Sequence, residues 1–416
     1  MNNIRSIQII GKLAFDDLGA SESLVWNMSR SFRKKGFQTE ILSTKVQSEM
    51  AGEFIEDVPI KRFEYFYPYF NLSDEAKAAF DQKDGNPYSW QMYRYLQRSP
   101  GVDILHSHAP QRLSNLVRLA ARKQKIPYVI SLFEAQNKTP ETGNEKMEML
   151  LEGTLHYGKL LDSLLKTRNA LQDADGILCL GKDECRILQQ RYPDKIVEYI
   201  PNGVDIDKFK IGPSRHFRER YNINNDADII LCAGRIDPQK NQLKLVELVN
   251  LLNQKHKSTH LLLIGQIASE SYYQKIQHRI QELHMEDRIT IIPGLNADDP
   301  ELVKAYHAAD FFILPSIKEP FGIVALEAWA SRLPVIAHKV GGLQNLITEK
   351  HNGLFYQNDS LEDLAAKYYL LKDHPDLRVK LIHNAYEEVC GNYCCQIIAE
   401  KILDFYQRVI EKYRVG

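Results

Sequence analysis

Short apolar runs and longer amphipathic stretches alternate along most of the chain. Runs of strand length occupy residues 6–10, 228–233 and 309–314, and each is followed by a loop and a stretch with helical periodicity. Alternating strands and helices predict α/β domains with parallel sheets. In such sheets, ligands bind outside the carboxyl ends of the strands. Functional residues are therefore expected in the loops that follow the predicted strands.

The clearest of these units spans residues 309–346. After its first strand, a loop carries Glu319 and Gly322, and the following helix carries Glu327. A second strand then leads to a Gly-Gly turn that opens another helix. Two carboxylates and a helix N-terminus are thus predicted at one site, where the glutamates could hold different hydroxyl-bearing parts of one ligand.

The start of this helix has the chemistry of an anion site. Gly322, Ile323 and Val324 would open the helix, so their N–H groups and the positive end of the helix dipole could hold a diphosphate. Gly322 has no side chain and lets the backbone approach closely. The alternative is an ordinary buried strand–helix unit with exposed glutamates.

The segment EPFGIVALE, from Glu319 to Glu327, resembles the E-x7-E signature of retaining glycosyltransferases of the GT4 type. This resemblance implies an α/β protein with the GT-B fold, in which two Rossmann-like doubly wound domains face each other across a cleft. It also implies that Glu327 holds the ribose of a nucleotide sugar and that Glu319 holds the transferred sugar.

Two cations follow the predicted strand at 228–233. Gly234, Arg235 and Lys240 belong to the segment GRIDPQKN at the carboxyl end of this strand. Arginine offers a planar fork and lysine a point charge, so together they could neutralise a leaving nucleoside diphosphate without a metal. The segment closely resembles the G-R-x4-K motif of GT4 proteins. An ordinary surface loop is the alternative.

A histidine pair ends an earlier predicted strand. The segment HSH places His106 and His108 on one strand face, and a near-neutral pKa suits His108 to hydrogen bonding with a hydroxyl or a reacting group. GT4 proteins have a functional histidine that matches His108, near the donor sugar and the acceptor. His106 is expected to be structural. A metal site is disfavoured, because no cysteine or third histidine follows nearby.

The first strand–helix loop departs from the family pattern. GT4 members usually carry a Gly-Gly pair there, whereas this chain has Gly19 followed by Ala20. The resemblance assigns Gly19 to donor binding. A plain turn with an N-cap at Ser21 or Ser23 is the alternative.

Two other loops concern the base and the acceptor. The resemblance assigns Gly294 and Leu295 to the backbone that reads the nucleobase. Phe133 and Glu134 end a further predicted strand where many relatives carry histidine followed by aspartate or glycine. In the family, this strand end belongs to the acceptor side of the site, so the departure bears on how an acceptor is bound.

The length of 416 residues suits two α/β domains of about 200 residues each. The segment PNGVD at 201–205 matches the GT4 loop between the domains. We therefore predict domains at 1–205 and 206–395, and a helix at 396–416 that returns to the first domain. With 53 Lys and Arg against 54 Asp and Glu, the formal net charge is -1, and no long-range field selects nucleic acid as a partner.

Cysteine usage and hydropathy bear on location. The six cysteines include no C-x-x-C pair or zinc pattern, which favours reduced thiols. The N-terminus has no long apolar core typical of a signal peptide, and the chain has no uninterrupted apolar run of about 18 residues. A cytoplasmic location is predicted. Any membrane contact is expected to be peripheral, at the inner face of the membrane.

Three pairs of aspartates have D-x-D spacing, a pattern that binds metal in the other large glycosyltransferase fold. None of them sits at a predicted strand end beside a nucleotide pocket, so all three are interpreted as incidental. The pairs are Asp173 and Asp175, Asp205 and Asp207, and Asp226 and Asp228. No metal site and no cofactor are therefore expected.

The resemblance covers nearly the whole chain and involves four motifs, in the order HSH, PNGVD, GRIDPQKN and EPFGIVALE. The resemblance implies a metal-independent retaining transferase that moves a sugar from a nucleoside diphosphate sugar to a hydroxyl acceptor. The acceptor could be a sugar, a glycan, a lipid or a small molecule. Two alternatives stay open: a GT-B-fold nucleotide-sugar epimerase or phosphorylase-like enzyme, and a non-catalytic nucleotide-sugar-binding subunit.

Overall fold

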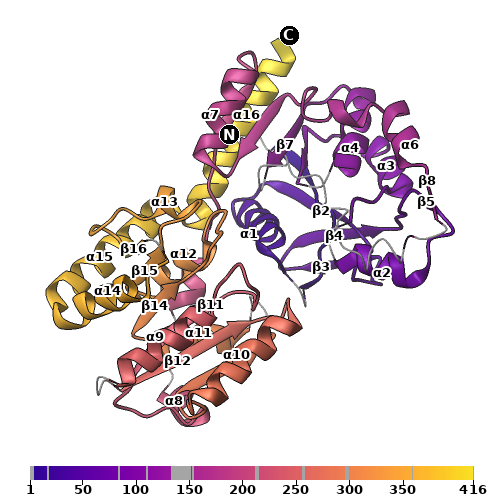
Figure 1. Cartoon of the computed structure of the whole chain (residues 1–416). Coiled ribbons are helices and arrows are strands. Elements are labelled where there is room, and N and C mark those ends of the chain that lie inside the picture. Colours follow the sequence, from indigo (N-terminus) through magenta and orange to yellow (C-terminus); the bar gives the residue numbers. More distant parts are fainter. Residues whose placement is uncertain are drawn as a thin grey trace. The chain divides into compact units, whose positions relative to one another are not determined.

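The computed structural model describes residues 4–15, 18–82, 85–108, 111–132, 151, 154–210, 215–254, 258–295, 299–357 and 359–415. The chain forms two compact units (Figure 1). The first contains Met1–Pro201 and Ile398–Gly416, and the second contains Asn202–Ile397. Within the described ranges, no helix has both the length and the apolar content that a bilayer-spanning helix needs.

The first unit is built on an eight-stranded sheet with the order β10-β9-β7-β6-β1-β2-β4-β3. Neighbouring strands are parallel except for β3, which runs antiparallel to β4. The order reverses between β1 and β6, so the loops after these two strands open at a topological switch point. The strands are β1 (Arg5–Ile9), β2 (Gln38–Thr44), β3 (Gly52–Ile55), β4 (Val58–Phe63), β6 (Ile104–Ser107), β7 (Tyr128–Leu132), β9 (Gly176–Cys179) and β10 (Ile196–Tyr199).

Helices cover both faces of this sheet. On one face, α1 and the C-terminal helix α16 share a core with β6, β7 and β9, and on the other face α3, α4 and α7 do so. A small pair of strands, β5 and β8, lies beside α6. These elements are α1 (Ala20–Lys34), β5 (Tyr69–Phe70), α2 (Asp74–Gln82), α3 (Trp90–Gln97), α4 (Gln111–Gln124), β8 (Leu155–His156), α6 (Gly158–Leu164), η2 (Thr167–Asn169), α7 (Lys182–Arg191) and α16 (Cys395–Val415).

Gly176 lets α16 lie directly on the sheet. A Cβ atom at this position would come within 2.7 Å of Val409 Cγ2 and 2.8 Å of Phe405 Cζ. Any larger residue would therefore push the helix away from β9. Through this contact, the last helix of the chain becomes part of the core of the first unit.

The second unit has a six-stranded sheet, all parallel, with the order β13-β12-β11-β14-β15-β16. This is the strand order of a doubly wound Rossmann domain, and its switch point lies between β11 and β14. The predicted α/β class with parallel sheets is confirmed. The strands are β11 (Asp228–Ala233), β12 (Thr259–Gly265), β13 (Ile289–Pro293), β14 (Phe311–Leu314), β15 (Val335–His338) and β16 (Leu354–Tyr356).

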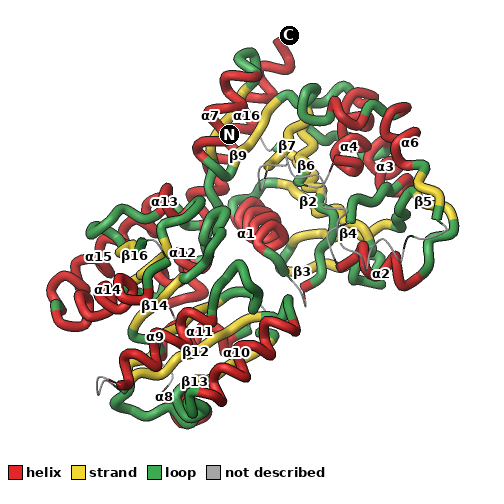
Figure 2. The backbone as a smooth tube through the Cα atoms, viewed as in Figure 1, coloured by secondary structure: helices red, strands yellow, loops and turns green. Residues whose placement is uncertain are grey.

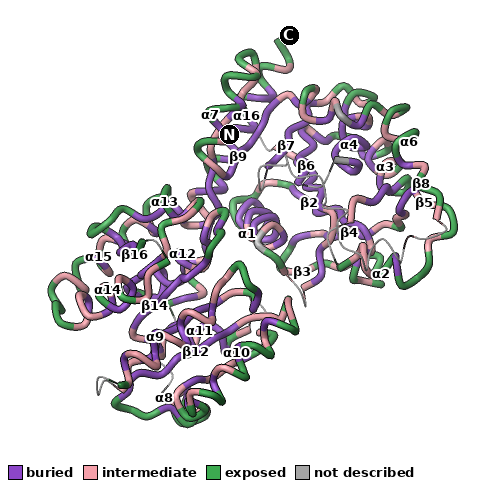
Figure 3. The backbone as a smooth tube through the Cα atoms, in the orientation of Figure 1, coloured by how far each residue is buried: buried purple, intermediate pink, exposed green. Residues whose placement is uncertain are grey.

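In this unit too, each face of the sheet is covered by helices (Figure 2). One face packs against α11, α12 and α15, and the other against α9, α10 and α14, which leaves most strand residues buried (Figure 3). The edge strand β13 is partly exposed. The elements between the strands are η3 (Ile206–Lys210), α8 (Arg215–Arg220), α9 (Leu243–Gln254), α10 (Glu270–Glu282), α11 (Pro300–Ala308), α12 (Ile323–Ala330), α13 (Leu343–Leu346), α14 (Leu361–Asp373) and α15 (Pro375–Asn392).

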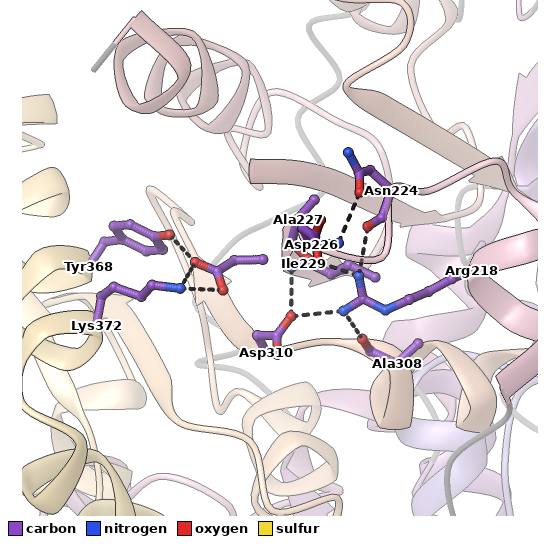
Figure 4. A network of polar contacts seen from close by, with 10 residues as sticks. Arg218, Asn224, Asp226, Ala227, Ile229, Ala308, Asp310, Tyr368 and Lys372 are labelled. Carbon is purple, nitrogen blue, oxygen red and sulfur yellow. Dashed lines mark hydrogen bonds and ion pairs between the residues drawn. The ribbon is translucent and has the colours of Figure 1, made fainter. Parts of the chain in front are cut away.

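Polar clamps hold the amino ends of β11 and β14 (Figure 4). The Asp228 carboxylate accepts hydrogen bonds from the Tyr368 hydroxyl at 2.7 Å and from Lys372 Nζ at 2.6 Å. Asp310 accepts from the Ile229 amide at 2.9 Å and pairs with Arg218 at 3.1 Å. These side chains tie α8 and α14 to one edge of the sheet, so Asp228 has a structural role.

Candidate functional site

Lys240 and Glu319 meet at the switch point of the second unit. Lys240 lies in the loop after β11, and Glu319 lies in the loop after β14, the neighbouring strand. The Lys240 Nζ atom is 2.5 Å from Glu319 Oε2, and the two side chains are only 18% and 8% exposed. Because water is largely excluded from both side chains, a charged ligand that binds here would have to rearrange this ion pair.

The loop that carries Glu319 is fixed by further contacts. Ser316 Oγ donates to the same carboxylate oxygen at 3.3 Å, and the Glu319 carbonyl accepts from the Gly342 amide at 2.8 Å. A Cβ at Gly341 would lie 2.2 Å from the Glu319 carbonyl oxygen, and one at Gly342 would lie 2.0 Å from the Pro320 oxygen. The Gly-Gly turn therefore packs its backbone directly against the candidate site.

Asp237 shapes the loop after β11. Its Oδ1 accepts from the amides of Gln239 at 2.8 Å and Lys240 at 3.1 Å, and its Oδ2 lies 3.6 Å from Arg235 Nη2. The Gln239 carbonyl in turn accepts from the Ile317 amide at 2.8 Å, which joins this loop to that of Glu319. Sequence reasoning missed Asp237, although an aspartate before proline is a turn signal.

Arg235 has a different environment from Lys240. Its side chain is 64% exposed, and the only ion pair described for it is the long contact with Asp237. Its backbone is held, because the Arg235 carbonyl accepts from Gln242 Nε2 at 2.7 Å. The guanidinium is thus available to move toward a ligand without breaking a buried contact.

Two of the predicted glycines, Gly234 and Gly294, lie at strand ends, and Gly265 ends the strand between them. Gly234 follows β11 with φ of +146°, and Gly265 ends β12 so close to it that a Cβ there would lie 2.0 Å from the Gly234 oxygen. Gly294 follows β13 with φ of +76°, and its amide donates to the Gly265 carbonyl at 3.2 Å. Leu295 is partly buried against the core of the same unit. Gly234, Gly294 and Leu295 therefore belong to one edge of the sheet.

Helix α12 begins as predicted. Gly322 is its N-cap with φ of +95°, and Ile323 is its first residue. A Cβ at Gly322 would meet Leu343 Cδ2 at 2.5 Å, so both the backbone angle and the space require glycine. Val324 follows in the first turn, and Glu327 lies in the same helix, where its Oε2 accepts from the Tyr306 hydroxyl at 2.7 Å.

His108 lies at the switch point of the first unit, directly after β6. Its amide donates to the Ile9 carbonyl at 2.7 Å, and its Nε2 is 3.0 Å from Gln8 Oε1. Burial lowers the pKa of His108 to about 3, so the expected near-neutral pKa is wrong. The imidazole is neutral at physiological pH and acts as a hydrogen-bonding group.

His106 is fully buried on the same strand. Its Nδ1 lies 2.6 Å from the Tyr406 hydroxyl, and its Nε2 lies 2.7 Å from Ser131 Oγ. Desolvation, and then the neighbouring His108, hold the pKa of His106 well below its usual range. Both ring nitrogens of His106 are therefore hydrogen bonded inside the core, which fits the expected structural role.

Gly19 is the N-cap of α1, and its φ of -77° is ordinary. Neither Ser21 nor Ser23 caps the helix, so the alternative of a serine N-cap does not hold. The Ser21 hydroxyl instead donates to Glu22 Oε2 at 2.8 Å, and a Cβ at Gly19 would lie 2.5 Å from that same oxygen. A carboxylate therefore already lies at the start of this helix. Phe133 and Glu134 lie outside the described residues.

Both units match known families. Residues 214–388 match the Glycosyl transferases group 1 family, and residues 21–208 match Glycosyltransferase Family 4. The chain is also 31% identical to the alpha-monoglucosyldiacylglycerol synthase of Streptococcus pneumoniae, over 79% of this chain and 73% of that protein. The chain belongs to glycosyltransferase family 4.

This family 4 member has further relatives. It is 32% identical to a D-inositol 3-phosphate glycosyltransferase of Pseudarthrobacter chlorophenolicus, over 44% of each chain. The chain spans only about half the length of several of the curated glycosyltransferases that it matches.

The fold is shared with solved structures. The structure of Anabaena Alr3699/HepE in complex with UDP is 16% identical, with a TM-score of 0.71 over 97% of this chain and 100% of that one. Likeness at this level of identity bears on the fold, and it confirms the predicted GT-B class with two Rossmann-like domains.

Proposed function

We propose that this chain is a retaining glycosyltransferase that moves a sugar from a nucleoside diphosphate sugar to a hydroxyl acceptor. The observation that carries the proposal is the buried Lys240–Glu319 pair at the switch point of the second unit. A cation suits the phosphates of such a donor, and a carboxylate suits the hydroxyls of its sugar. The two groups sit together where a doubly wound domain binds nucleotides.

In the proposed reaction, the bond between the sugar C1 and the diphosphate oxygen breaks. Lys240, Arg235 and the N–H groups of Ile323 and Val324 stabilise the charge that develops on the leaving nucleoside diphosphate. A charged hydrogen bond contributes about 1.5–3 kcal/mol. Lys240 exchanges Glu319 for a phosphate, which leaves the Glu319 carboxylate to accept hydrogen bonds from the sugar.

These cations supply the positive charge that a divalent ion supplies in other transferases. We therefore propose that transfer needs neither a metal nor another cofactor. Activity that persists after dialysis against EDTA is expected, and activity restored only by Mg²⁺ or Mn²⁺ would contradict this part of the proposal.

The acceptor hydroxyl forms the new bond to C1 on the face from which the diphosphate leaves, which gives retention. Its proton passes to a diphosphate oxygen. His108 is a poor general base, because burial lowers its pKa to about 3. The proposed role of His108 is therefore to hydrogen bond a hydroxyl of the donor sugar or the acceptor.

The relatives suggest which ligands to test first. The Anabaena structure contains UDP, which makes uridine diphosphate sugars the first donors to try. Two relatives are named for a glycosylated diacylglycerol and for inositol 3-phosphate, so lipid and sugar-phosphate acceptors both belong in the panel. A lipid acceptor would bring this chain to the inner face of a membrane.

The test is a thermal-shift panel of nucleoside diphosphates and their sugars, followed by acceptor screening with the donor that stabilises most. Glycosyl transfer predicts free nucleoside diphosphate only when acceptor is present. A changed nucleotide sugar without acceptor would indicate an epimerase. Stabilisation by a donor without any product would indicate a nucleotide-sugar-binding subunit.

A further inference from the structure

A row of buried polar side chains crosses the face of the first sheet that α16 covers. Ser6, Gln8, His106 and Ser131 come from β1, β6 and β7, and Tyr406 comes from α16. All five are at most 2% exposed. Because water cannot reach them, each donor in this row needs an acceptor within the protein.

The direction of the hydrogen bonds follows from one end of the row. The Ser6 hydroxyl donates to Thr39 Oγ1 at 3.1 Å and accepts from Gln8 Nε2 at 2.9 Å. This orientation of the amide turns Gln8 Oε1 toward His108 Nε2 at 3.0 Å and toward the Tyr406 hydroxyl at 3.2 Å. An amide oxygen can only accept, so both partners must donate to it.

The other end of the row agrees with this direction. The Tyr406 hydroxyl donates its one hydrogen bond to Gln8 Oε1. The Tyr406 oxygen therefore accepts a hydrogen bond from His106 Nδ1, which lies 2.6 Å away. A neutral imidazole with its proton on Nδ1 has an acceptor at Nε2, and the Ser131 hydroxyl lies 2.7 Å from that atom. Every bond in the row then has one donor and one acceptor.

We propose that Gln8, held by Ser6 and Tyr406, is a positioning residue that fixes the proton of His108 on Nε2. The Nδ1 atom of His108 is then a hydrogen-bond acceptor for a substrate hydroxyl, which must displace protein atoms to reach it because this nitrogen is buried. This catalytic consequence rests on the proposed function, whereas the position of the proton does not. Low pKa values keep both imidazoles neutral through the physiological range, so their hydrogen bonds decide which nitrogen carries the proton.

This arrangement gives the last helix of the chain a part in the candidate site. The Tyr406 hydroxyl reaches Gln8 only because α16 packs closely on the sheet at Gly176. The aromatic ring of Tyr406 is further held edge-on against Phe32 of α1, with ring centroids 5.9 Å apart. The site at the end of β6 therefore depends on residues about 300 positions further along the chain.

The direct test is the tautomer of His108 in the full chain labelled with ¹⁵N-histidine. Long-range ¹⁵N–¹H correlation spectra distinguish a protonated ring nitrogen from an unprotonated one, and His108→Gln identifies the His108 signals. We expect protonated Nε2 in His108 and protonated Nδ1 in His106. A His108 signal with protonated Nδ1 would overturn the proposal, whatever the chain's activity.

Variants test how the proton is held. Gln8→Glu places a carboxylate at the same point, which when ionised can only accept, so spectra at pH 8 should keep the Nε2 tautomer of His108. Gln8→Leu removes the acceptor and should give a mixture of tautomers. If Gln8→Leu does not fold, the wild-type and Gln8→Glu spectra still decide the matter. An unchanged single tautomer in folded Gln8→Leu would contradict the role of Gln8.

Tyr406→Phe tests the direction of the row. Without the hydroxyl, His106 loses its acceptor at Nδ1 and should move its proton to Nε2, where Ser131 can accept it. Tyr128→Phe is the matched control, since Tyr128 is 1% exposed in the same unit and donates to the Ala170 carbonyl at 3.0 Å. This control should leave both histidine tautomers unchanged, and an unchanged His106 in Tyr406→Phe would overturn the assigned direction.

Kinetics add a readout that depends on the proposed function. Losing one hydrogen bond of about 1 kcal/mol corresponds to roughly a fivefold lower rate. Tyr406→Phe should therefore lower kcat about fivefold with little change in the donor KM, and Tyr128→Phe should not. If the wild type transfers no sugar, the proposed function fails while the spectra still decide the tautomer. If transfer occurs and kcat is unaffected, the positioning role fails alone.

Discussion

The Lys240 ammonium lies 2.5 Å from the Glu319 carboxylate, although the two residues are 79 positions apart in the chain. The contact forms because β11 and β14 are adjacent strands and both loops extend from the same edge of the sheet. It joins the two motifs that the proposed function needs, and it makes that function open to direct tests.

Lys240→Ala should lower the transfer rate roughly 100- to 1000-fold, the usual effect of removing one donor from a closed site. It should also lower the melting temperature, because Glu319 is left with its charge buried. Steady-state kinetics and thermal unfolding measure the two effects. Lys244→Ala is the control: Lys244 pairs with Asp359 at 2.9 Å and is 14% exposed, so it should lose stability and keep activity. Near-wild-type turnover in Lys240→Ala would refute the scheme.

Arg235→Ala should separate activity from stability. The side chain is 64% exposed with one long ion pair, so removing it should change the free energy of unfolding by about 0.5 kcal/mol or less. The transfer rate should still fall, because the guanidinium is proposed to act on the leaving diphosphate. Arg220→Ala offers a control with the same 64% exposure and an ion pair to Glu301. Equal rates in these two variants would count against a role for Arg235.

Gly342→Ala should disturb the site by displacing the loop that carries Glu319. The added Cβ would lie 2.0 Å from the Pro320 oxygen, which forces the loop after β14 to move. We expect destabilisation of about 1–3 kcal/mol and weaker donor binding, measured by denaturant unfolding and thermal shift. Gly391→Ala, near the end of α15, meets nothing within 4 Å and should be neutral or slightly stabilising. Wild-type donor binding in Gly342→Ala would show that the loop tolerates the displacement.

His108 should make stability depend on pH. Its pKa is about 3 in the folded chain and about 6.5 when unfolded, so the unfolded chain binds more protons between these values. The stabilisation is complete above pH 6.5 and is lost as the pH falls toward 3. His108→Gln should therefore reduce the slope of unfolding free energy between pH 4 and 6, by up to about 1.4 kcal/mol per pH unit. His216→Gln, at a side chain 90% exposed, is the control. Equal slopes in the wild type and His108→Gln would argue against burial of a neutral His108.

Much of the fold could be predicted from local patterns. The strand run at 228–233 and the helix that begins near Gly322 follow from hydrophobic periodicity and from a glycine at the helix start. The order of the motifs also placed Lys240 and Glu319 in loops after strands. The serine N-cap considered as an alternative for the first helix does not form, because Gly19 is the N-cap and the Ser21 hydroxyl donates to Glu22.

By itself, the sequence determined the α/β class, the carboxyl-edge loops and the residue types available there, because these depend on periodicity and turn chemistry within short segments. Tertiary structure decided which of those residues meet. The Lys240–Glu319 pair depends on the adjacency of β11 and β14, and the low pKa of His108 depends on its burial at the end of β6. The bond from Tyr406 to Gln8 depends on how α16 packs. Burial and long-range contacts arise from packing between distant segments, and no local pattern encodes them.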